Sequence, residues 1–162
     1  MPQRVPALHL LVLDTSGSMR GERLAQAKGW AGALIAQAAR AGDHVALLSF
    51  GGQGVQLLLP PAPARASAVV RVRPLGGGGG TPLDNALAQA DQLLAQAARS
   101  GRTGGAWLWL LTDGRTLAAP QRPAHAQQLV LVDFDDPLRP AGQCAAWAAR
   151  WGARYLHAAQ GV

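Results

Sequence analysis

The sequence alternates short, almost entirely apolar runs with longer alanine-rich segments, and this alternation restricts the folds that the chain can adopt. The first apolar run, residues 9–13, is typical of a strand buried on both faces of a sheet. Apolar side chains then recur at spacings of three and four residues from Leu24 to Ala38, which predicts a helix that buries one stripe. Gly42 predicts the end of that helix.

The same alternation continues through the rest of the chain. Further strands are predicted at residues 44–50, 55–59, 106–111, 129–132 and 154–157, and further helices at 65–73, from Pro82 through Leu94, and at 140–151. The glycine-rich residues 51–54 predict a hairpin between the first two of these strands. We expect Pro60, Pro61 and Pro63 to end the second strand of that hairpin.

Strands and helices in this order predict an α/β fold. We expect a doubly wound, mostly parallel sheet with one antiparallel edge hairpin and helices on both faces. The 162 residues suit one domain over residues 1–162. We expect the five tryptophans to serve the core, with Trp107 and Trp109 on one side of their strand and Trp147 and Trp151 stacked on their helix.

Composition excludes several classes of protein. The net charge is +6, but fourteen of the fifteen basic residues are arginines scattered along the chain without a basic run, so we expect no nucleic-acid partner. The single Cys144 cannot form an internal disulfide, which favours a reducing compartment. The first apolar run is too short for a signal peptide or a membrane span. We therefore expect a cytoplasmic protein that does not bind membranes.

Two carboxylates follow apolar strands directly. Asp14 lies at the carboxyl end of the first predicted strand, and Asp113 at that of the strand at 106–111. Ligands of open α/β sheets bind beyond the carboxyl ends of the strands, where the strand order reverses. If these two strands are neighbours, both carboxylates reach one crevice, and the glycine loop 76–80 can bring Thr81 over it.

Five oxygen-bearing side chains form the candidate site: Asp14, Ser16, Ser18, Thr81 and Asp113. Hard cations take such ligands, and Mg²⁺ prefers an octahedron that keeps some water. Mn²⁺ or Ca²⁺ would suit the same oxygens. We expect Gly17 to permit a turn in which the two serines point the same way. Because hydroxyls are neutral, such a site keeps positive charge on the ion, which attracts a carboxylate from another protein.

These segments resemble a known family. Asp14–Met19 is similar to the DxSxS motif of the von Willebrand factor A domain, and Gly80–Leu83 and Leu111–Gly114 match its downstream threonine and aspartate pieces in order. The resemblance implies a metal-ion-dependent adhesion site. There, Ser16, Ser18 and Thr81 would coordinate the ion directly or nearly so. Asp14 and Asp113 would act largely through water, and an Asp or Glu of a partner would fill the sixth position.

The sequence resembles one branch of this family most, the carboxyl-terminal domain of the magnesium-chelatase D subunit and its cobaltochelatase relatives. Similar segments include residues 26–29, 58–61, 111–115 and 152–155. The resemblance implies a non-catalytic part of a complex in which an AAA+ ATPase drives metal insertion into a tetrapyrrole held by a large subunit. The AAA+-like module and the acidic linker of that branch do not precede residue 1, which we expect to reflect a separate small subunit or a fragment. The alternative is a stand-alone domain that acts with another AAA+ ATPase or in adhesion.

The same residues also allow simpler roles, and their spacing excludes some enzyme classes. Asp14 and Asp113 are also suited to capping helices or turns, and Arg115 either receives an acidic partner or is simply exposed. A haloacid-dehalogenase phosphatase needs a second aspartate where Ser16 stands, and no G-x-S-x-G elbow surrounds the serines. The glycine loop lacks the lysine of a P-loop. The chain is therefore expected to bind rather than to catalyse.

Overall fold

The computed structural model describes residues 4–52, 54–68, 70 and 82–161 of the chain. These residues form strands, helices and short 3₁₀ turns in the order β1 (Leu8–Asp14), η1 (Gly17–Met19), α1 (Glu22–Ala41), β2 (His44–Gly51), β3 (Gly54–Pro63), α2 (Leu83–Ser100), β4 (Ala106–Thr112), β5 (Gln128–Asp133), α3 (Cys144–Trp151), β6 (Arg154–His157) and η2 (Ala158–Gln160).

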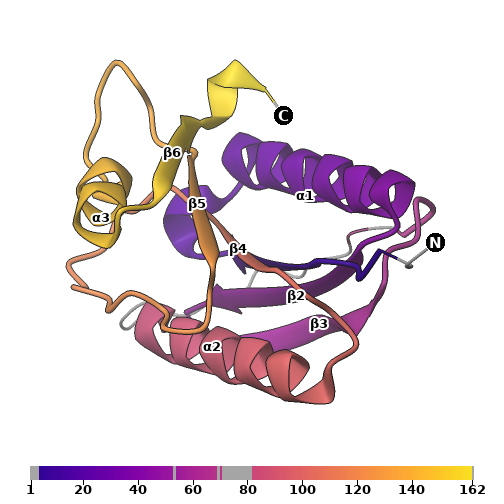
Figure 1. Cartoon of the computed structure of the whole chain (residues 1–162). Helices are drawn as coiled ribbons and strands as arrows, with labels where there is room; N and C mark the ends of the chain where they lie inside the picture. The colour runs from indigo at the N-terminus through magenta and orange to yellow at the C-terminus, as the bar shows by residue number, and fades with distance from the viewer. Residues whose placement is uncertain (1–3, 53, 69, 71–81, 162) are drawn as a thin grey trace.

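The six strands form one sheet in the order β3-β2-β1-β4-β5-β6 (Figure 1). Every neighbouring pair is parallel except β2 and β3, which form an antiparallel hairpin at one edge. From the central β1 the chain builds the sheet toward β3, and after α2 it returns to the other side of β1 with β4. The strand order therefore reverses between β1 and β4.

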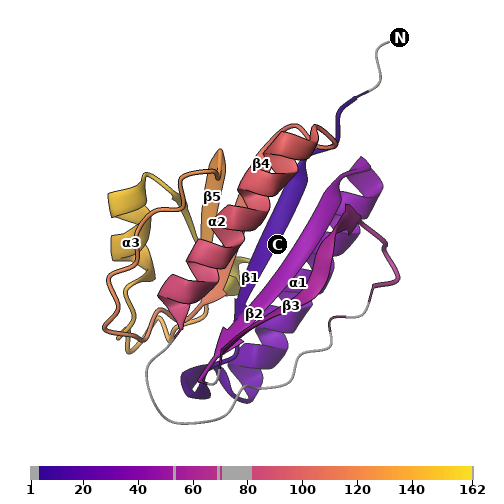
Figure 2. The same ribbon diagram turned by 90° about the horizontal axis from the view of Figure 1, so that it is seen from below.

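Helices cover both faces of this sheet. On one face Ile35 of α1 packs with Leu11 of β1, and on the other Leu87 of α2 and Trp147 of α3 pack with Leu10. Figure 2, seen from below, shows α2 lying across the sheet with α1 behind it. The predicted fold, with a mostly parallel sheet, one antiparallel edge hairpin and helices on both faces, is confirmed.

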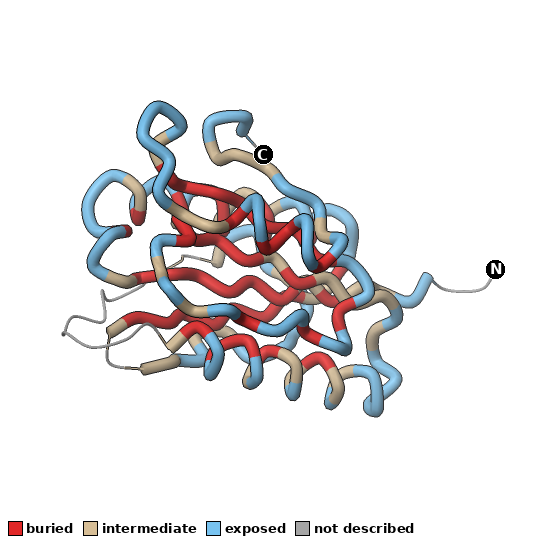
Figure 3. The backbone as a smooth tube through the Cα atoms, turned by 90° about the vertical axis from the view of Figure 1, so that its left-hand side faces the viewer, coloured by how far each residue is buried: buried red, intermediate tan, exposed pale blue. Residues whose placement is uncertain are grey.

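The central strand alternates between the two layers of the core. Leu8, Leu10 and Val12 belong to the cluster beneath α2 and α3, whereas Leu11 and Leu13 belong to the cluster beneath α1. Buried residues follow the strands through the middle of the molecule (Figure 3). A strand covered on both faces needs apolar side chains at successive positions, which explains why this segment reads as a continuous apolar run.

The tryptophans lie as their spacing predicts. Trp107 and Trp109 share one side of β4 and stack with ring centroids 5.7 Å apart. Trp147 and Trp151 stack along α3 with ring centroids 6.3 Å apart. Trp30 and the α3 pair are buried, while the β4 pair is half-buried.

The predicted end of the hairpin's second strand is wrong. β3 continues through the prolines and pairs Ala62 with Val45 and Pro63 with His44. β3 is the last described strand at its edge of the sheet, with a partner on one side only. An edge strand tolerates proline because the missing N–H can face outward, where no ladder bond is lost.

Two predicted helices also differ. Residues 65–68 and 70 form a turn and irregular chain rather than a helix, and residues 69 and 71–73 lie outside the described part. α3 begins at Cys144 rather than near Pro140. The N–H groups of Ala141 and Gly142 bind the Asp135 carboxylate, so this segment is a loop held to the end of β5 rather than a helical turn.

The amino-terminal edge of the sheet contains a buried carboxylate, Asp43, which directly precedes β2. It accepts the N–H of Ala7 at 3.0 Å, and its oxygens lie 2.9 Å from Arg4 Nη2 and 3.1 Å from His9 Nε2. His9 Nδ1 accepts the indole N–H of Trp109 at 3.2 Å, so Nε2 carries the ring proton that is donated to Asp43. The network ties β1, β2 and β4 together where the strands begin.

Candidate metal centre

The carboxyl ends of β1 and β4 are side by side at the point where the strand order reverses. The register pairs Leu13 with Leu111, so Asp14 follows the last paired residues by one position and Asp113 by two. Both side chains are buried, with 3% and 1% of their surfaces exposed. The predicted condition, neighbouring strands that bring both carboxylates to one crevice, is therefore met.

Asp14 is held by neutral donors. Its Oδ1 accepts the N–H of Ser16 at 2.8 Å, and its Oδ2 accepts the hydroxyl of Thr112 at 2.6 Å. Burial raises the pKa of Asp14; the bonds from Thr112 and Ser16 offset part of that effect, and the nearby charge of Asp113 adds to it. The carboxylate is thus fixed in orientation by groups that do not neutralise its charge.

The two serines lie close together at the start of η1. Ser16 Oγ and Ser18 Oγ are 3.5 Å apart. Two oxygens bound to one Mg²⁺ are at most about 4.2 Å apart, so both hydroxyls can reach a single ion. The expected role of Gly17 is wrong: its φ is not positive, and a Cβ built there would meet nothing within 4 Å. The short 3₁₀ turn itself, rather than a glycine conformation, aligns the hydroxyls.

Asp113 is paired with a cation from a distant part of the chain. Arg23, in the first turn of α1, places Nη1 3.2 Å from Asp113 Oδ2 and 3.3 Å from the carbonyl oxygen of Ser18. The N–H of Arg115 binds the other Asp113 oxygen, Oδ1, at 3.1 Å. Both oxygens of Asp113 therefore have donors, and one donor is charged.

A third strand end adds a further buried carboxylate, Asp135, just after β5. Arg115 Nε lies 2.6 Å from Asp135 Oδ1, and Arg23 Nη2 lies 3.8 Å from the same oxygen. Burial opposes the ionisation of Asp135, but the N–H groups of Ala141 and Gly142 and the Arg115 guanidinium outweigh it and hold its pKa below the usual 3.8. The structure gives Arg115 a role that differs from both predicted alternatives: it ties the loop after β4 to the loop after β5.

These two loops touch through their backbones. A Cβ built on Gly142 would lie 1.9 Å from the carbonyl oxygen of Asp113, and one on Gly114, whose φ is +66°, would lie 2.9 Å from the backbone of Gln143 and Cys144. The N–H of Gln143 donates to the carbonyl oxygen of Gly114 at 3.0 Å. Glycine at 142 therefore allows the loop before α3 to support Asp113 from behind.

Thr81, the fifth predicted ligand, and the glycine loop 76–80 lie outside the described residues. The described chain resumes at Pro82, which is the N-cap of α2 rather than its first helical residue, so the helix begins at Leu83, one residue later than predicted. The structure thus brings together Asp14, Ser16, Ser18 and Asp113, and Thr81 stays a prediction.

The donor set suits a hard divalent cation. Asp14 and Asp113 supply two negative charges, and Ser16 and Ser18 supply neutral oxygens next to them. Among the described residues, no group of three or more His, Cys, Asp and Glu side chains has the arrangement of a metal cluster. A site of two carboxylates completed by hydroxyls does not belong to that class, and the oxygens present fit Mg²⁺ better than a metal that prefers nitrogen or sulfur.

Several residues that shape this edge were not predicted from the sequence: Arg23, Thr112, Asp135 and Gly142. Arg23 had a signal, because a cation in the first turn of a helix opposes the helix dipole and so points to an acidic partner. Thr112 lies within Leu111–Gly114, one of the segments that resemble the family motif, but no role was predicted for it. Asp135 and Gly142 act through contacts between loops, which no local pattern reveals.

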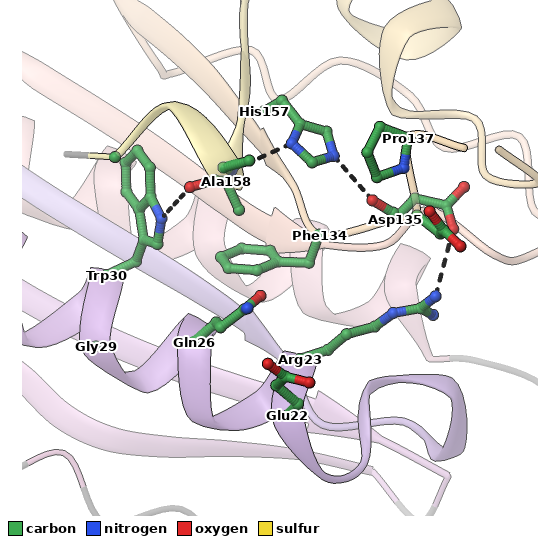
Figure 4. Close-up of a pocket in the computed structure, with 13 residues that line it drawn as sticks. Glu22, Arg23, Gln26, Gly29, Trp30, Phe134, Asp135, Pro137, His157 and Ala158 are labelled. Atoms are coloured by element: carbon green, nitrogen blue, oxygen red, sulfur yellow. Dashed lines mark hydrogen bonds and ion pairs between the residues drawn. The ribbon is translucent and has the colours of Figure 1, made fainter. Parts of the chain in front are cut away.

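A pocket of about 590 Å³ opens beside this edge, between α1, the loop after β5 and η2. Arg23, Gln26 and Trp30 of α1 line one side, and Phe134 and His157 line the other (Figure 4). His157 Nε2 donates to the carbonyl oxygen of Asp135 at 2.8 Å, while its Nδ1 accepts the N–H of Ala159 at 3.1 Å. Both ring nitrogens of His157 are thus used to hold the pocket wall.

Comparisons with known proteins agree with this architecture. The profile of the von Willebrand factor type A domain matches residues 9–115. The magnesium-chelatase 60 kDa subunit of Cereibacter sphaeroides is 42% identical over 119 residues, which cover 74% of this chain and 21% of that protein. The magnesium-chelatase 67 kDa subunit of Chlorobaculum parvum is 39% identical over 123 residues, which cover 74% of this chain and 20% of that protein. The chain thus spans about a fifth of the length of these relatives.

A solved structure shares the fold at low sequence identity. The aerotolerance-related membrane protein of Bacteroides fragilis superposes with a TM-score of 0.62 at 15% identity, over 93% of this chain and 90% of that chain. Among the described residues of the present chain, no helix has the length and apolar character needed to cross a membrane.

Proposed function

This chain belongs to the von Willebrand factor type A domain family, and from that premise we propose that it is a protein-binding domain whose binding depends on Mg²⁺ at the carboxyl edge of the sheet. The observation that supports this most directly is the convergence of Asp14, Ser16, Ser18 and Asp113 at the strand-order reversal. Mn²⁺ or Ca²⁺ would suit the same oxygens.

In this proposal each side chain has a separate task. Ser16 and Ser18, together with Thr81, offer their hydroxyl oxygens to the ion. Asp14 and Asp113 supply negative charge from behind, largely through water. The ion contributes a positive charge that the carboxylate of a partner's Asp or Glu completes. The groups that contact the ion directly are neutral hydroxyls, and the two aspartates act through water. Positive charge therefore remains on the ion and is available to the partner's carboxylate.

Burial supports the assignment of Asp14 to this task. Its carboxyl group is buried beside Asp113 and is held by the Ser16 N–H and the Thr112 hydroxyl rather than by a cation, and burial raises its pKa. A carboxylate that serves the fold alone gains more from a paired cation, as Asp43 does at the opposite edge. Strongly perturbed carboxylates in a crevice are characteristic of functional sites.

We further propose that the partner belongs to an ATP-dependent metallochelatase and that this domain performs no catalytic step itself. The support is the similarity to two magnesium-chelatase subunits over about three quarters of the chain. In this setting the partner is the AAA+ ATPase subunit or the large chelatase subunit, and the domain links them when Mg²⁺ is bound.

A capture experiment tests the proposal. The chain is immobilised and offered the AAA+ ATPase subunit of a magnesium chelatase, in Mg²⁺ and in EDTA. We expect capture in Mg²⁺ only, and we expect Asp14→Ala to reduce it to the level seen in EDTA. Asp91→Ala is the matched control, because Asp91 is a half-buried carboxylate of α2 that pairs with His125 rather than with the site.

Titration calorimetry with MgCl₂ separates the two parts of the proposal. If the wild type binds Mg²⁺, Asp14→Ala does not, and the ATPase is not captured, the metal site is supported and the partner is another protein. Capture that survives both EDTA and Asp14→Ala would refute a metal-bridged mode of binding.

A further inference from the structure

Arg23 places a permanent positive charge at the same carboxylate that the proposed metal centre needs. Its Nη1 lies 3.2 Å from Asp113 Oδ2, and its side chain is only 25% exposed. The same nitrogen donates to the carbonyl oxygen of Ser18 at 3.3 Å, so the guanidinium is held between the strand end of β4 and the turn that carries the serines. A guanidinium stays protonated at any physiological pH.

A second carboxylate lies within reach of the same guanidinium. Arg23 Nη2 is 3.8 Å from Asp135 Oδ1, and Figure 4 shows the side chain extending from α1 toward Asp135. Arg23 also lines the pocket of about 590 Å³ beside the site. The guanidinium therefore has both an alternative acceptor and room to move toward it without unfolding any element.

The first turn of α1 gives this arrangement a cost that the fold does not need. The positive end of the helix dipole lies at the amino terminus of α1, where an arginine is unfavourable. Glu22 in the same turn has the favourable charge. The position of Arg23 is therefore better explained by its contacts across the crevice than by the stability of α1.

We propose that Arg23 is a built-in competitor of the divalent ion: it pairs with Asp113, and ion binding transfers its guanidinium toward Asp135. This inference rests on the proposed function, because it concerns the regulation of the same site. Its consequence is that ion affinity is set below what the oxygens alone would provide. Ion binding also changes the wall of the neighbouring pocket, since Arg23 belongs to both.

The test is the affinity of the whole chain for Mn²⁺ and Mg²⁺, measured by Mn²⁺ electron paramagnetic resonance and by calorimetry. Charges of +1 and +2 that lie about 6 Å apart repel enough, even in a water-like dielectric, to weaken binding about tenfold. We therefore expect Arg23→Met to tighten ion binding by about tenfold or more. Arg23→Lys keeps the charge and should stay near the wild-type affinity.

Arg20→Met is the matched control, because it removes an equal charge from an exposed position three residues earlier in the chain. We expect its ion affinity to remain within about twofold of wild type, since exposed charges are screened. Thermal unfolding without added ion shows whether each variant folds. If Arg23→Met does not fold, Arg23→Gln replaces it, because its amide still donates to Asp113 without a charge.

The outcomes are distinguishable. Unchanged or weaker ion binding by folded Arg23→Met or Arg23→Gln overturns the inference but leaves the metal site in place. Equal tightening by Arg20→Met also overturns it, because the effect would then be a general change of net charge. Binding by none of the proteins overturns both this inference and the proposed metal centre.

Discussion

Asp43 is buried at the amino edge of the sheet, where the parallel strands begin, and Asp14 is buried at the carboxyl edge, where they end. The pKa values of these two aspartates shift in opposite directions. At the amino edge, burial by itself would raise the pKa of Asp43, but the N–H of Ala7 together with His9 and Arg4 holds that pKa below the usual 3.8. At the carboxyl edge, burial raises the pKa of Asp14, and the donors from Thr112 and Ser16 do not outweigh it.

The difference lies both in how deeply the surrounding protein encloses each carboxylate and in its donors. Asp43 and Asp14 are 6% and 3% exposed. Asp43 has a guanidinium beside it, whereas Asp14 has a hydroxyl, an amide and a second carboxylate, Asp113. The amino edge uses its carboxylate to hold strands together, whereas the carboxyl edge gives Asp14 neutral donors, an arrangement that we propose suits a bound cation.

The largest effect is expected where the backbone supports the carboxyl edge. Gly142→Ala should lower the free energy of unfolding by about 3 kcal/mol, because overpacking against backbone atoms cannot be relieved by side-chain rotation. The new Cβ would lie 1.9 Å from the Asp113 carbonyl oxygen. Urea denaturation monitored by circular dichroism measures the loss.

Gly104→Ala is the corresponding change at the amino edge. Its Cβ would lie 3.4 Å from a side-chain carbon of Val5, an exposed residue that can move. We expect Gly104→Ala to lower the free energy of unfolding by less than about 1 kcal/mol. Equal losses at the two glycines would mean that the close approach of the loop to Asp113 is not rigid.

A smaller effect is expected from the paired aspartate. Asp43→Asn should lower the free energy of unfolding by about 1–2 kcal/mol at pH 7. The loss is kept small because the Arg4 partner is largely exposed and solvent screens its charge. The folded-state pKa of Asp43 is lowered, so its contribution is fully present above 3.8 and is lost as pH falls through the folded pKa. Denaturation at pH 7 and at pH 3 should show the variant and the wild type converging in acid. A constant difference across this range would contradict the pairing.

The smallest change in stability is expected from Asp14→Asn, whose free energy of unfolding at pH 7 should differ from that of the wild type by less than about 1 kcal/mol. The neutral amide avoids the cost of burying a charge and the repulsion by Asp113, and this gain offsets the altered hydrogen bond to Thr112. The folded-state pKa of Asp14 is raised, so wild-type stability falls as pH rises from 3.8 through that pKa, and the variant lacks this fall. We expect MgCl₂ to raise the melting temperature of the wild type and to leave that of this variant unchanged. A loss of stability as large as that of Asp43→Asn would remove the contrast between the edges.

Much of the fold was predictable because its signals are local. The continuous apolar run of β1, the helical stripe of α1 and the tryptophan spacings each depend on a few neighbouring residues and on burial. Proline in β3 was misjudged because its cost depends on which side of the strand has a neighbour, and that is a property of the whole sheet. Gly17 was misjudged because the 3₁₀ turn at η1 requires no positive φ.

The candidate site divides along the same line. The residues of the chain alone specified its strand-end aspartates and its paired serines, because a short motif after an apolar strand can be recognised without knowing what lies beside it. Only the folded molecule decided that β1 and β4 are neighbours, that Arg23 reaches Asp113 and that Gly142 passes behind it. Those contacts join residues that are 29 to 98 positions apart in the sequence, and their energies depend on distances that packing alone determines.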